Sequence, residues 1–299
     1  MASFRTLQSS NRRKTIGLLL GFGLLLWIVS YSAMSYFGAT GVGVIPIAVG
    51  ISLVSVWGSY YASDRLVLTM TGARVIQESD NPKLFDLVQE VCLASGLPMP
   101  KVAIVVDPAP NAFATGRDPE HALIAFTTGI LEVMERDELQ GVVAHEMAHV
   151  ANRDTLVSAI AATTAGAIAL LSDFLMRILW FGGGRRNQNN GNPLALILSF
   201  VVILLAPLAA MLLKSAISRK RESLADATAV QYTRNPTGLR KALEVLARDS
   251  TVVQQRSTAV AHIWIESPLD SKAVSKLFST HPPIQERIAT LRRLESGGV

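Results

Sequence analysis

Apolar residues gather in long blocks along the chain, and most polar residues lie between these blocks. Positions 15–63 hold 49 residues without a charge, whereas one bilayer-spanning helix needs about 20. Glycine and threonine residues between 38 and 43 interrupt this block, so it predicts two spans, at 15–37 and 44–62. Two later apolar blocks, at 155–181 and 193–213, predict a third and a fourth span. We therefore expect a four-span helical membrane protein.

A signal peptide is the alternative interpretation of the first block, because Arg12, Arg13 and Lys14 precede it. The apolar run exceeds the roughly 7–15 residues of such a signal, and a second run follows directly, which favours spans. In the third block, Asp173 and Arg177 share one helix face. An ionised residue inside a span indicates a functional site by default, but a salt-bridged pair near a helix end is the simpler interpretation.

Basic residues flank the spans in a pattern that indicates their orientation. Short basic flanks stay cytoplasmic, and four basic residues precede the first span while four follow the last: Arg5, Arg12, Arg13, Lys14, Lys214, Arg219, Lys220 and Arg221. Only two arginines, in the polar loop 182–192, oppose this orientation. Both termini and both polar pieces are therefore predicted to be cytoplasmic. The expected domains are 1–62 (tail and two spans), 63–154 (first part of a cytoplasmic domain), 155–213 (membrane hairpin) and 214–299 (second part).

Composition narrows the class of protein further. Hydrophobic residues make up 49% of the 299 positions and charged residues 17%, which excludes a disordered chain. A single cysteine, Cys92, excludes an internal disulfide framework and a cysteine-rich zinc site. The formal net charge of +5 is explained by the basic flanks of the spans, so we expect no nucleic-acid partner.

The two polar pieces show the periodicities of a mainly helical domain with a small sheet. Helical spacing of apolar residues places Cys92 on the buried stripe of a helix at 82–95, which indicates a core residue rather than a reactive thiol. The remaining predicted elements are strands at 102–106 and 122–126, a turn-rich segment at 107–120, and helices at 137–153, 219–233, 238–249 and 283–294.

A motif with metal-site spacing lies in the helix at 137–153. His145 and His149 are four residues apart, so both imidazoles project from one face and can bind one ion. Glu146 points about 100 degrees away from His145, since an α-helix has 3.6 residues per turn, and can reach a metal-bound water rather than the metal. Zinc lowers the pKa of such a water toward about 7, and Glu146 can take its proton as the water attacks a carbonyl.

The helix at 219–233 offers the missing third ligand. Glu222 and Asp226 lie four residues apart on one face of that helix. We expect Glu222 to bind Zn²⁺ with the two histidines, and Asp226 to accept the N–H from the far nitrogen of one of them. The alternative is an amphipathic helix with solvated acids. Because the two membrane spans of the hairpin separate His149 from Glu222, the zinc site is expected close to the membrane surface.

Four ordered segments resemble the HtpX family of membrane-bound zinc endopeptidases, which are gluzincins, and are more distantly similar to the CAAX prenyl proteases. They are DELQGVVAHEMAH at 137–149, SRKRESLAD at 218–226, NAFATG at 111–116, and STHPP at 279–283 with the following ERI at 286–288. The resemblance implies a prokaryotic inner-membrane protease. Its substrates would be misfolded or damaged membrane proteins, and its role would be membrane protein quality control.

The resemblance also extends to two residues whose spacing alone indicates no catalytic or binding role. It implies that Asn111 lines the substrate cleft and hydrogen-bonds a substrate backbone, where spacing alone suggests a turn asparagine. It implies that His281 stabilises the oxyanion of the tetrahedral intermediate, where capping of the last helix is an equal alternative. Arg287 can anchor the segment around His281, and its role stays open.

Two other classes of function compete with a zinc endopeptidase. A non-catalytic membrane adaptor with a structural zinc would be expected to have a fourth protein ligand, and the sequence shows none while keeping Glu146. A transporter would be expected to have polar groups near the membrane midplane. The predicted spans contain almost none beyond Asp173 and Arg177, which disfavours this class. Among enzymes, a prenyl-peptide protease is disfavoured because those relatives have more spans. Lipid and unfolded protein are the expected partners, and the sequence indicates no oligomeric state.

Overall fold

The computed structural model describes residues 43–161, 163, 219–249, 263–265 and 283–296, together with scattered residues between 13 and 31. The predictions for the span at 193–213, for Asp173 and Arg177, and for His281 lie outside the described residues. The first predicted span is described only in part, and the third only at its start, where 154–161 is helical.

The described part of the chain is mainly helical, with one small mixed sheet, as predicted. Its elements in chain order are α2 (Val44–Thr71), β1 (Arg74–Val75), η1 (Glu78–Asp80), α3 (Pro82–Ser95), β2 (Lys101–Val105), β3 (Ala112–Thr115), η2 (Pro119–His121), β4 (Leu123–Thr127), α4 (Thr128–Val133), α5 (Arg136–Ala151), α8 (Arg219–Thr233), α9 (Pro236–Arg248) and α11 (Ile284–Glu295). The helices at 82–95 and 219–233 have the predicted bounds, and the other predicted helices of the polar domain agree within two residues. The helix α2 extends beyond its predicted end, and α4 was not predicted.

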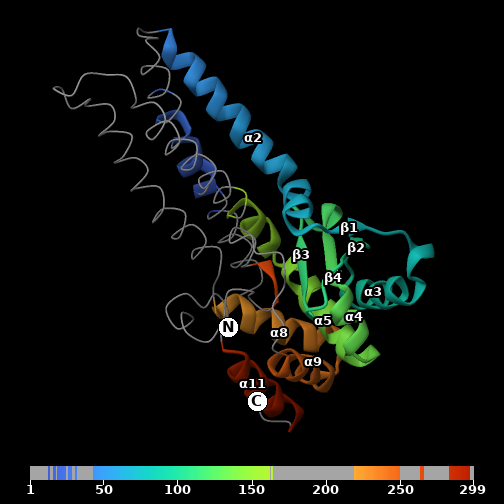
Figure 1. Ribbon diagram of the computed structural model, residues 1–299. Helices are drawn as coiled ribbons and strands as arrows, with labels where there is room; N and C mark the ends of the chain where they lie inside the picture. Colours follow the sequence, from blue (N-terminus) through green and yellow to red (C-terminus); the bar gives the residue numbers. More distant parts are fainter. Residues whose placement is uncertain are drawn as a thin grey trace, which may run out of the picture.

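The helix α2 continues beyond its predicted end at residue 62 and joins the polar domain (Figure 1). Its segment Ile45–Ala62 is long and apolar enough to cross a membrane. Its last turns are different, because Val67 and Thr71 are fully buried, and Val67 packs against the sheet. The helix ends only at Gly72, which takes a left-handed φ of 69°. One rigid helix therefore connects the apolar segment directly to the core.

The sheet has the strand order β1-β2-β4-β3, with β2 and β4 parallel and the other pairs antiparallel. Strand β3 lies within the segment 107–120, which was predicted to be turn-rich and was not among the predicted strands. All four of its residues are buried, and its pairing with β4 supplies the long-range contact that a local pattern does not reveal. It forms one edge of the sheet.

Alternating residues place the two faces of the sheet in two different cores. On one face, Ile124 and Phe126 of β4 pack with α3 and α5. On the other face, Phe113 and Ala125 pack with Val67 of α2, with residue 159 of the helical segment 154–161, and with Trp264. The sheet therefore stands between the helix α5 and the base of the apolar helices.

The helix α5 is the centre of the domain and contacts α3, β3, α8 and α9. A capping box fixes its start, where the backbone N of Glu135 donates to Glu138 Oε2 at 2.9 Å. Every residue from Gly141 to Ala148 is buried, as expected for a helix surrounded by other elements on all sides. Its histidines are therefore held in a packed environment.

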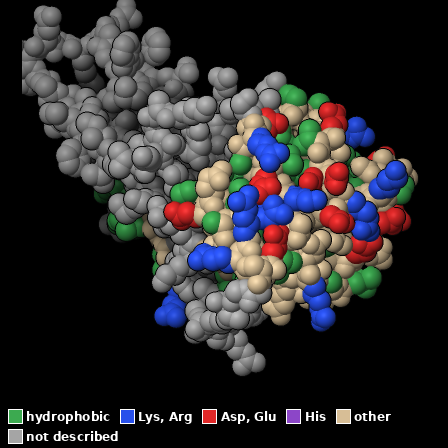
Figure 2. Space-filling view, turned by 90° about the horizontal axis from the view of Figure 1, so that it is seen from below, with side chains coloured by type: hydrophobic (Ala, Val, Ile, Leu, Met, Phe, Trp, Pro, Cys, Tyr) green, Lys and Arg blue, Asp and Glu red, His purple; other side chains and the backbone are tan. Residues whose placement is uncertain are grey.

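The helices α9 and α11 close the domain on the side away from α2 (Figure 1). Asn235 caps α9 by accepting from the backbone N of Gly238 at 3.2 Å. Ion pairs join the two helices on the outside, for example Arg240 with Glu295 at 2.7 Å and Arg292 with Glu244 at 2.7 Å. Figure 2 shows basic and acidic side chains interspersed over the domain surface seen from below.

Candidate metal centre

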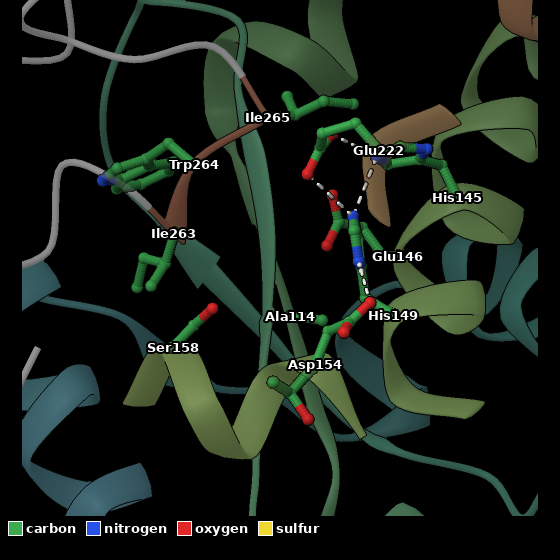
Figure 3. A pocket seen from close by; sticks show the side chains of 11 residues that line it. Ala114, His145, Glu146, His149, Asp154, Ser158, Glu222, Ile263, Trp264 and Ile265 are labelled. Carbon is green, nitrogen blue, oxygen red and sulfur yellow. Dashed lines mark hydrogen bonds and ion pairs between the residues drawn. The ribbon is translucent and has the colours of Figure 1, made fainter. Parts of the chain in front are cut away.

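The structure brings three of the predicted residues together in one cluster (Figure 3). The Nε2 atoms of His145 and His149 on α5 lie 3.2 Å apart. Glu222 on α8 places its Oε2 3.6 Å from Nε2 of His145 and its Oε1 3.5 Å from Nε2 of His149. Two helices that are far apart in the sequence therefore bring two imidazole nitrogens and one carboxylate together, in a group that could hold a metal ion.

The spacing of these atoms fits a tetrahedral metal ion. Zinc–nitrogen and zinc–oxygen bonds of about 2.0–2.1 Å place two ligands of a tetrahedral site about 3.3 Å apart. The two imidazole nitrogens lie 3.2 Å apart, and each lies 3.5 or 3.6 Å from a different oxygen of Glu222, so these separations are also close to that value. Two imidazoles and one carboxylate form a ligand set that leaves a fourth position for water or substrate, which is typical of catalytic zinc sites.

Asp226 lies where its predicted role requires. Its Oδ1 is 3.0 Å from Nδ1 of His145, so a proton on Nδ1 leaves the lone pair of Nε2 for a metal. Arg287 of α11 donates to both carboxylate oxygens of Asp226, from Nε at 2.9 Å and from Nη2 at 2.7 Å. Arg287, whose role the sequence left open, therefore holds Asp226 in the core. Burial opposes ionisation of Asp226, but the charge of Arg287 keeps its pKa below the usual range.

A signal for Arg287 was present in the sequence and was missed. Apolar residues at 284, 288 and 291 form the buried stripe of α11, and Arg287 lies on this stripe. An arginine on a buried stripe requires an acidic partner, since an unpaired buried charge is costly. The pattern could therefore have indicated a buried carboxylate opposite α11.

Asp154 was also missed, although it contacts the second histidine. Its Oδ2 lies 3.1 Å from Nδ1 of His149, which is the same relation that Asp226 has to His145. Asp154 lies five positions after His149, so the two would not share a helix face even if α5 continued. The contact depends on a turn after α5 in which Arg153 takes a φ of 57°. The sequence contains no pattern that announces such a turn.

The cluster carries an excess of negative charge. Four buried carboxylates surround it, and two buried guanidinium groups accompany them: Glu146, Asp154, Glu222, Asp226, Arg221 and Arg287. Burial and the charge of Arg287 lower the pKa of His145, but hydrogen bonds to Asp226 and Glu222 outweigh them and raise it to about 9. A site that draws protons onto its imidazoles attracts a divalent cation for the same electrostatic reason.

Glu146 lies in the same pocket as the three ligands (Figure 3). It is 3% exposed, and burial raises its pKa above the ordinary value, which suits a group that accepts a proton and later returns it. The polar side of the pocket faces an apolar side formed by Ala114 of β3 and by the segment Ile263, Trp264 and Ile265. The pocket therefore has Glu146, which can accept a proton, on one side and an apolar surface that can contact an apolar group on the other.

The strand β3 presents its free edge to this pocket. Asn111 pairs with Thr127 through its backbone, so Ala112 and Ala114 direct their backbone groups away from β4. The carbonyl of Ala112 accepts from the backbone N of Ile265 at 2.9 Å, and the carbonyl of Gly116 accepts from Thr155 Oγ1 at 3.0 Å. Ala114, between them, receives no hydrogen bond along this edge from any described residue.

Asn111 directly precedes β3, but it is not among the described residues that line the pocket. It is 3% exposed, and its Oδ1 accepts from the backbone N of Ala112 at 3.0 Å. The structure thus places its side chain against the start of β3. Its expected contact with substrate stays a prediction, as does the role of His281, which lies outside the described residues.

A metal-binding histidine pair on a buried helix, a glutamate from a second helix and an adjacent acid are the features of a metal-dependent hydrolase. Residues 78–295 match peptidase family M48. The chain belongs to this family and is a metallopeptidase, so the resemblance inferred from the motifs is confirmed.

Curated relatives agree with this assignment, and one solved structure shares the fold. A Protease HtpX homolog from Caldanaerobacter subterraneus subsp. tengcongensis is 44% identical over 292 residues, which cover 96% of this chain and 97% of that protein. One from Tropheryma whipplei (strain TW08/27) is 46% identical over 274 residues, covering 92% and 90%. The crystal structure of S. mikatae Ste24p shares the fold, with a TM-score of 0.51 at 17% identity, over 96% of this chain and 66% of that one.

Proposed function

We propose that this chain is a zinc endopeptidase anchored in the cytoplasmic membrane, in which His145, His149 and Glu222 hold one Zn²⁺. The observation that carries the proposal is the position of Glu146, which lies in one pocket with all three ligands. A bound zinc would supply Lewis-acid polarisation of the scissile carbonyl and activation of a water. Glu146 accepts the proton of that water and passes it to the leaving amine.

The residues around the site prepare it for this reaction. Asp226 keeps the proton of His145 on Nδ1, and Arg287 keeps Asp226 ionised and in place. The free backbone edge at Ala114 can pair with an extended substrate segment. The apolar side of the pocket can receive an apolar side chain, and Asn111 and His281 remain candidates for further contacts with the substrate.

The apolar helix α2 supports the placement at a membrane. Its segment Ile45–Ala62 presents Trp57 and Tyr61, which are 66% and 48% exposed and suit a membrane interface. The guanidinium carbon of Arg117 lies 5.5 Å from the ring centroid of Tyr61, so the edge of the domain is close to this belt. Four spans, cytoplasmic termini and a cytoplasmic active site complete the proposal, as the basic flanks of the spans suggest.

A site close to the membrane surface, as proposed, would suit substrates that emerge from the bilayer. We infer that misfolded or damaged membrane proteins are hydrolysed, because the open backbone position at Ala114 suits an extended, unpaired segment of chain. A folded domain presents few such segments, whereas a damaged membrane protein exposes them. This role is quality control of membrane proteins.

The test compares detergent-purified protein with the Glu146→Gln variant on an unfolded membrane protein and on the same protein folded. Zinc-dependent cleavage of the unfolded form is expected, with loss of cleavage but retention of zinc in Glu146→Gln. Glu132→Gln, an exposed change on α4, serves as the matched control and should cleave normally. Cleavage by Glu146→Gln at the wild-type rate would reject the role of Glu146. Bound zinc without any cleavage by the wild type would favour a non-catalytic adaptor.

A further inference from the structure

Each histidine of the metal centre contacts, through Nδ1, the aspartate of a buried arginine–aspartate pair. Arg287 and Asp226 support His145, as described above. On the other side, Nη1 of Arg221 lies 3.4 Å from Oδ1 of Asp154, and Oδ2 of Asp154 lies 3.1 Å from Nδ1 of His149. Asp154 therefore contacts Arg221 and His149 through different oxygens.

The chain takes an unusual route to place Asp154 there. The helix α5 ends at Ala151, and Arg153 then adopts a left-handed backbone with φ 57°, which a residue other than glycine adopts only at a cost. This turn reverses the chain so that Asp154, at the start of the following helical segment, faces back toward His149 (Figure 3). Asp154 is 4% exposed, so its carboxylate is removed from solvent.

Arg221 connects this arrangement to the third ligand. It directly precedes Glu222 on α8, and it is 6% exposed. The same turn of α8 therefore supplies a ligand for the metal and the cation that holds Asp154. A shift of α8 relative to α5 would disturb both contacts at once, so the pair couples the orientation of His149 to the position of Glu222.

We propose that Asp154, held by Arg221, is a positioning residue that fixes His149 with its proton on Nδ1 and its Nε2 directed at the metal. This inference rests on the proposed function, because it assumes that His149 is a metal ligand. Carboxylates that hydrogen-bond a metal-binding histidine orient the ring and raise its basicity, and their loss lowers metal affinity about 10- to 100-fold. Asp154 should therefore control the affinity for Zn²⁺.

A purely structural role is the competing explanation, since a buried ion pair between two helical segments can also hold the fold together. Two variants separate the roles. Asp154→Asn removes the negative charge that faces Nδ1 of His149 and leaves Arg221 without a carboxylate at this position, which can lower stability. The double variant Asp154→Asn/Arg221→Met removes both charges and keeps the volume, so it should recover stability without restoring a carboxylate at Nδ1 of His149.

The experiment measures the Kd of the detergent-solubilised full chain for Zn²⁺ by competition with a chromophoric chelator, and thermal unfolding of the metal-free protein. We expect both the single and the double variant to bind Zn²⁺ about 10- to 100-fold more weakly than the wild type. Asp118→Asn is the matched control, because Asp118 pairs with Nδ1 of His121 at the surface, and its Kd should equal that of the wild type.

The outcomes are distinct. A double variant with wild-type stability and wild-type Kd would overturn the positioning role and leave only a structural ion pair. Weak binding by both variants, with the control unchanged, supports the proposal. A wild-type protein that binds no Zn²⁺ would instead overturn the metal centre and with it the proposed function. The Kd does not depend on peptidase activity, so a failure of catalysis alone does not affect this test.

Discussion

A close approach of two helices beside the metal centre occurs at Gly141, one turn before His145 on α5. A Cβ atom at position 141 would lie 2.6 Å from the backbone N of Leu239 and 2.7 Å from its Cα. Ordinary contact begins at 3.4 Å, so Gly141→Ala requires α5 and α9 to separate by about 0.8 Å, the difference from the 2.6 Å contact. The obstacle is backbone on α9, which cannot rotate away as a side chain would.

Two effects of opposite sign decide the result. Alanine is favoured over glycine inside a helix by about 1 kcal/mol, whereas overpacking a core costs about 1–3 kcal/mol. The cost should lie toward the upper end of that range, because separation also loosens buried residues of α9 such as Leu243 and Leu246. We expect a net loss of about 1–2 kcal/mol, which lowers Tm by about 2–8 °C for a domain of this size.

Thermal unfolding followed by circular dichroism in detergent measures this loss, with zinc-dependent peptidase activity as a second readout. Activity should fall with stability, because α5 carries both histidines. Gly58→Ala is the control, since no described residue lies within 4 Å of a Cβ at this position of α2, and it should be neutral or stabilising by up to about 1 kcal/mol. A Gly141→Ala protein with a Tm at or above that of the wild type would refute the reasoning.

Two further predictions concern buried polar groups. Arg287→Met should lower the free energy of unfolding by about 3–5 kcal/mol, because it leaves Asp226 buried without its cation. The double variant Asp226→Asn/Arg287→Met should recover most of this loss in thermal unfolding of the metal-free protein. An unchanged Tm in the single variant would contradict the pairing. Burial raises the pKa of Cys92 to about 11, so its thiol should react with iodoacetamide at pH 8 far more slowly in the native protein than in denaturant, and equal rates would show that Cys92 is exposed.

Local patterns in the sequence were sufficient for most of the helices. Asn81 and Gly96 bound α3 as cap residues, and the apolar stripe between them gives the helix its buried face. The same locality explains why His145 and His149 could be paired from their spacing alone. Residues four positions apart on a helix must share a face, so the metal-binding spacing is a property of the sequence itself.

Contacts between residues far apart in the sequence were predictable only where a metal site needed a further ligand. Two histidines lack a third ligand, and this deficit pointed to Glu222, which lies 73 positions after His149. Strand β3 escaped prediction because it has only four residues and becomes a strand through pairing with β4. The extension of α2 to Thr71 was missed because Asp64 and Arg65 suggested a boundary, although charged residues do not end a helix.

The sequence by itself thus determined the chemistry of the site, meaning two histidines and a glutamate on one helix and two acids at helical spacing on another. Only the tertiary structure decided which charged residues contact these histidines and acids. Arg221 reaches Asp154 across 67 positions of sequence, and Arg287 reaches Asp226 across 61. Such contacts depend on how helices pack and where one turn reverses the chain, and packing arises from the whole core rather than from any local pattern.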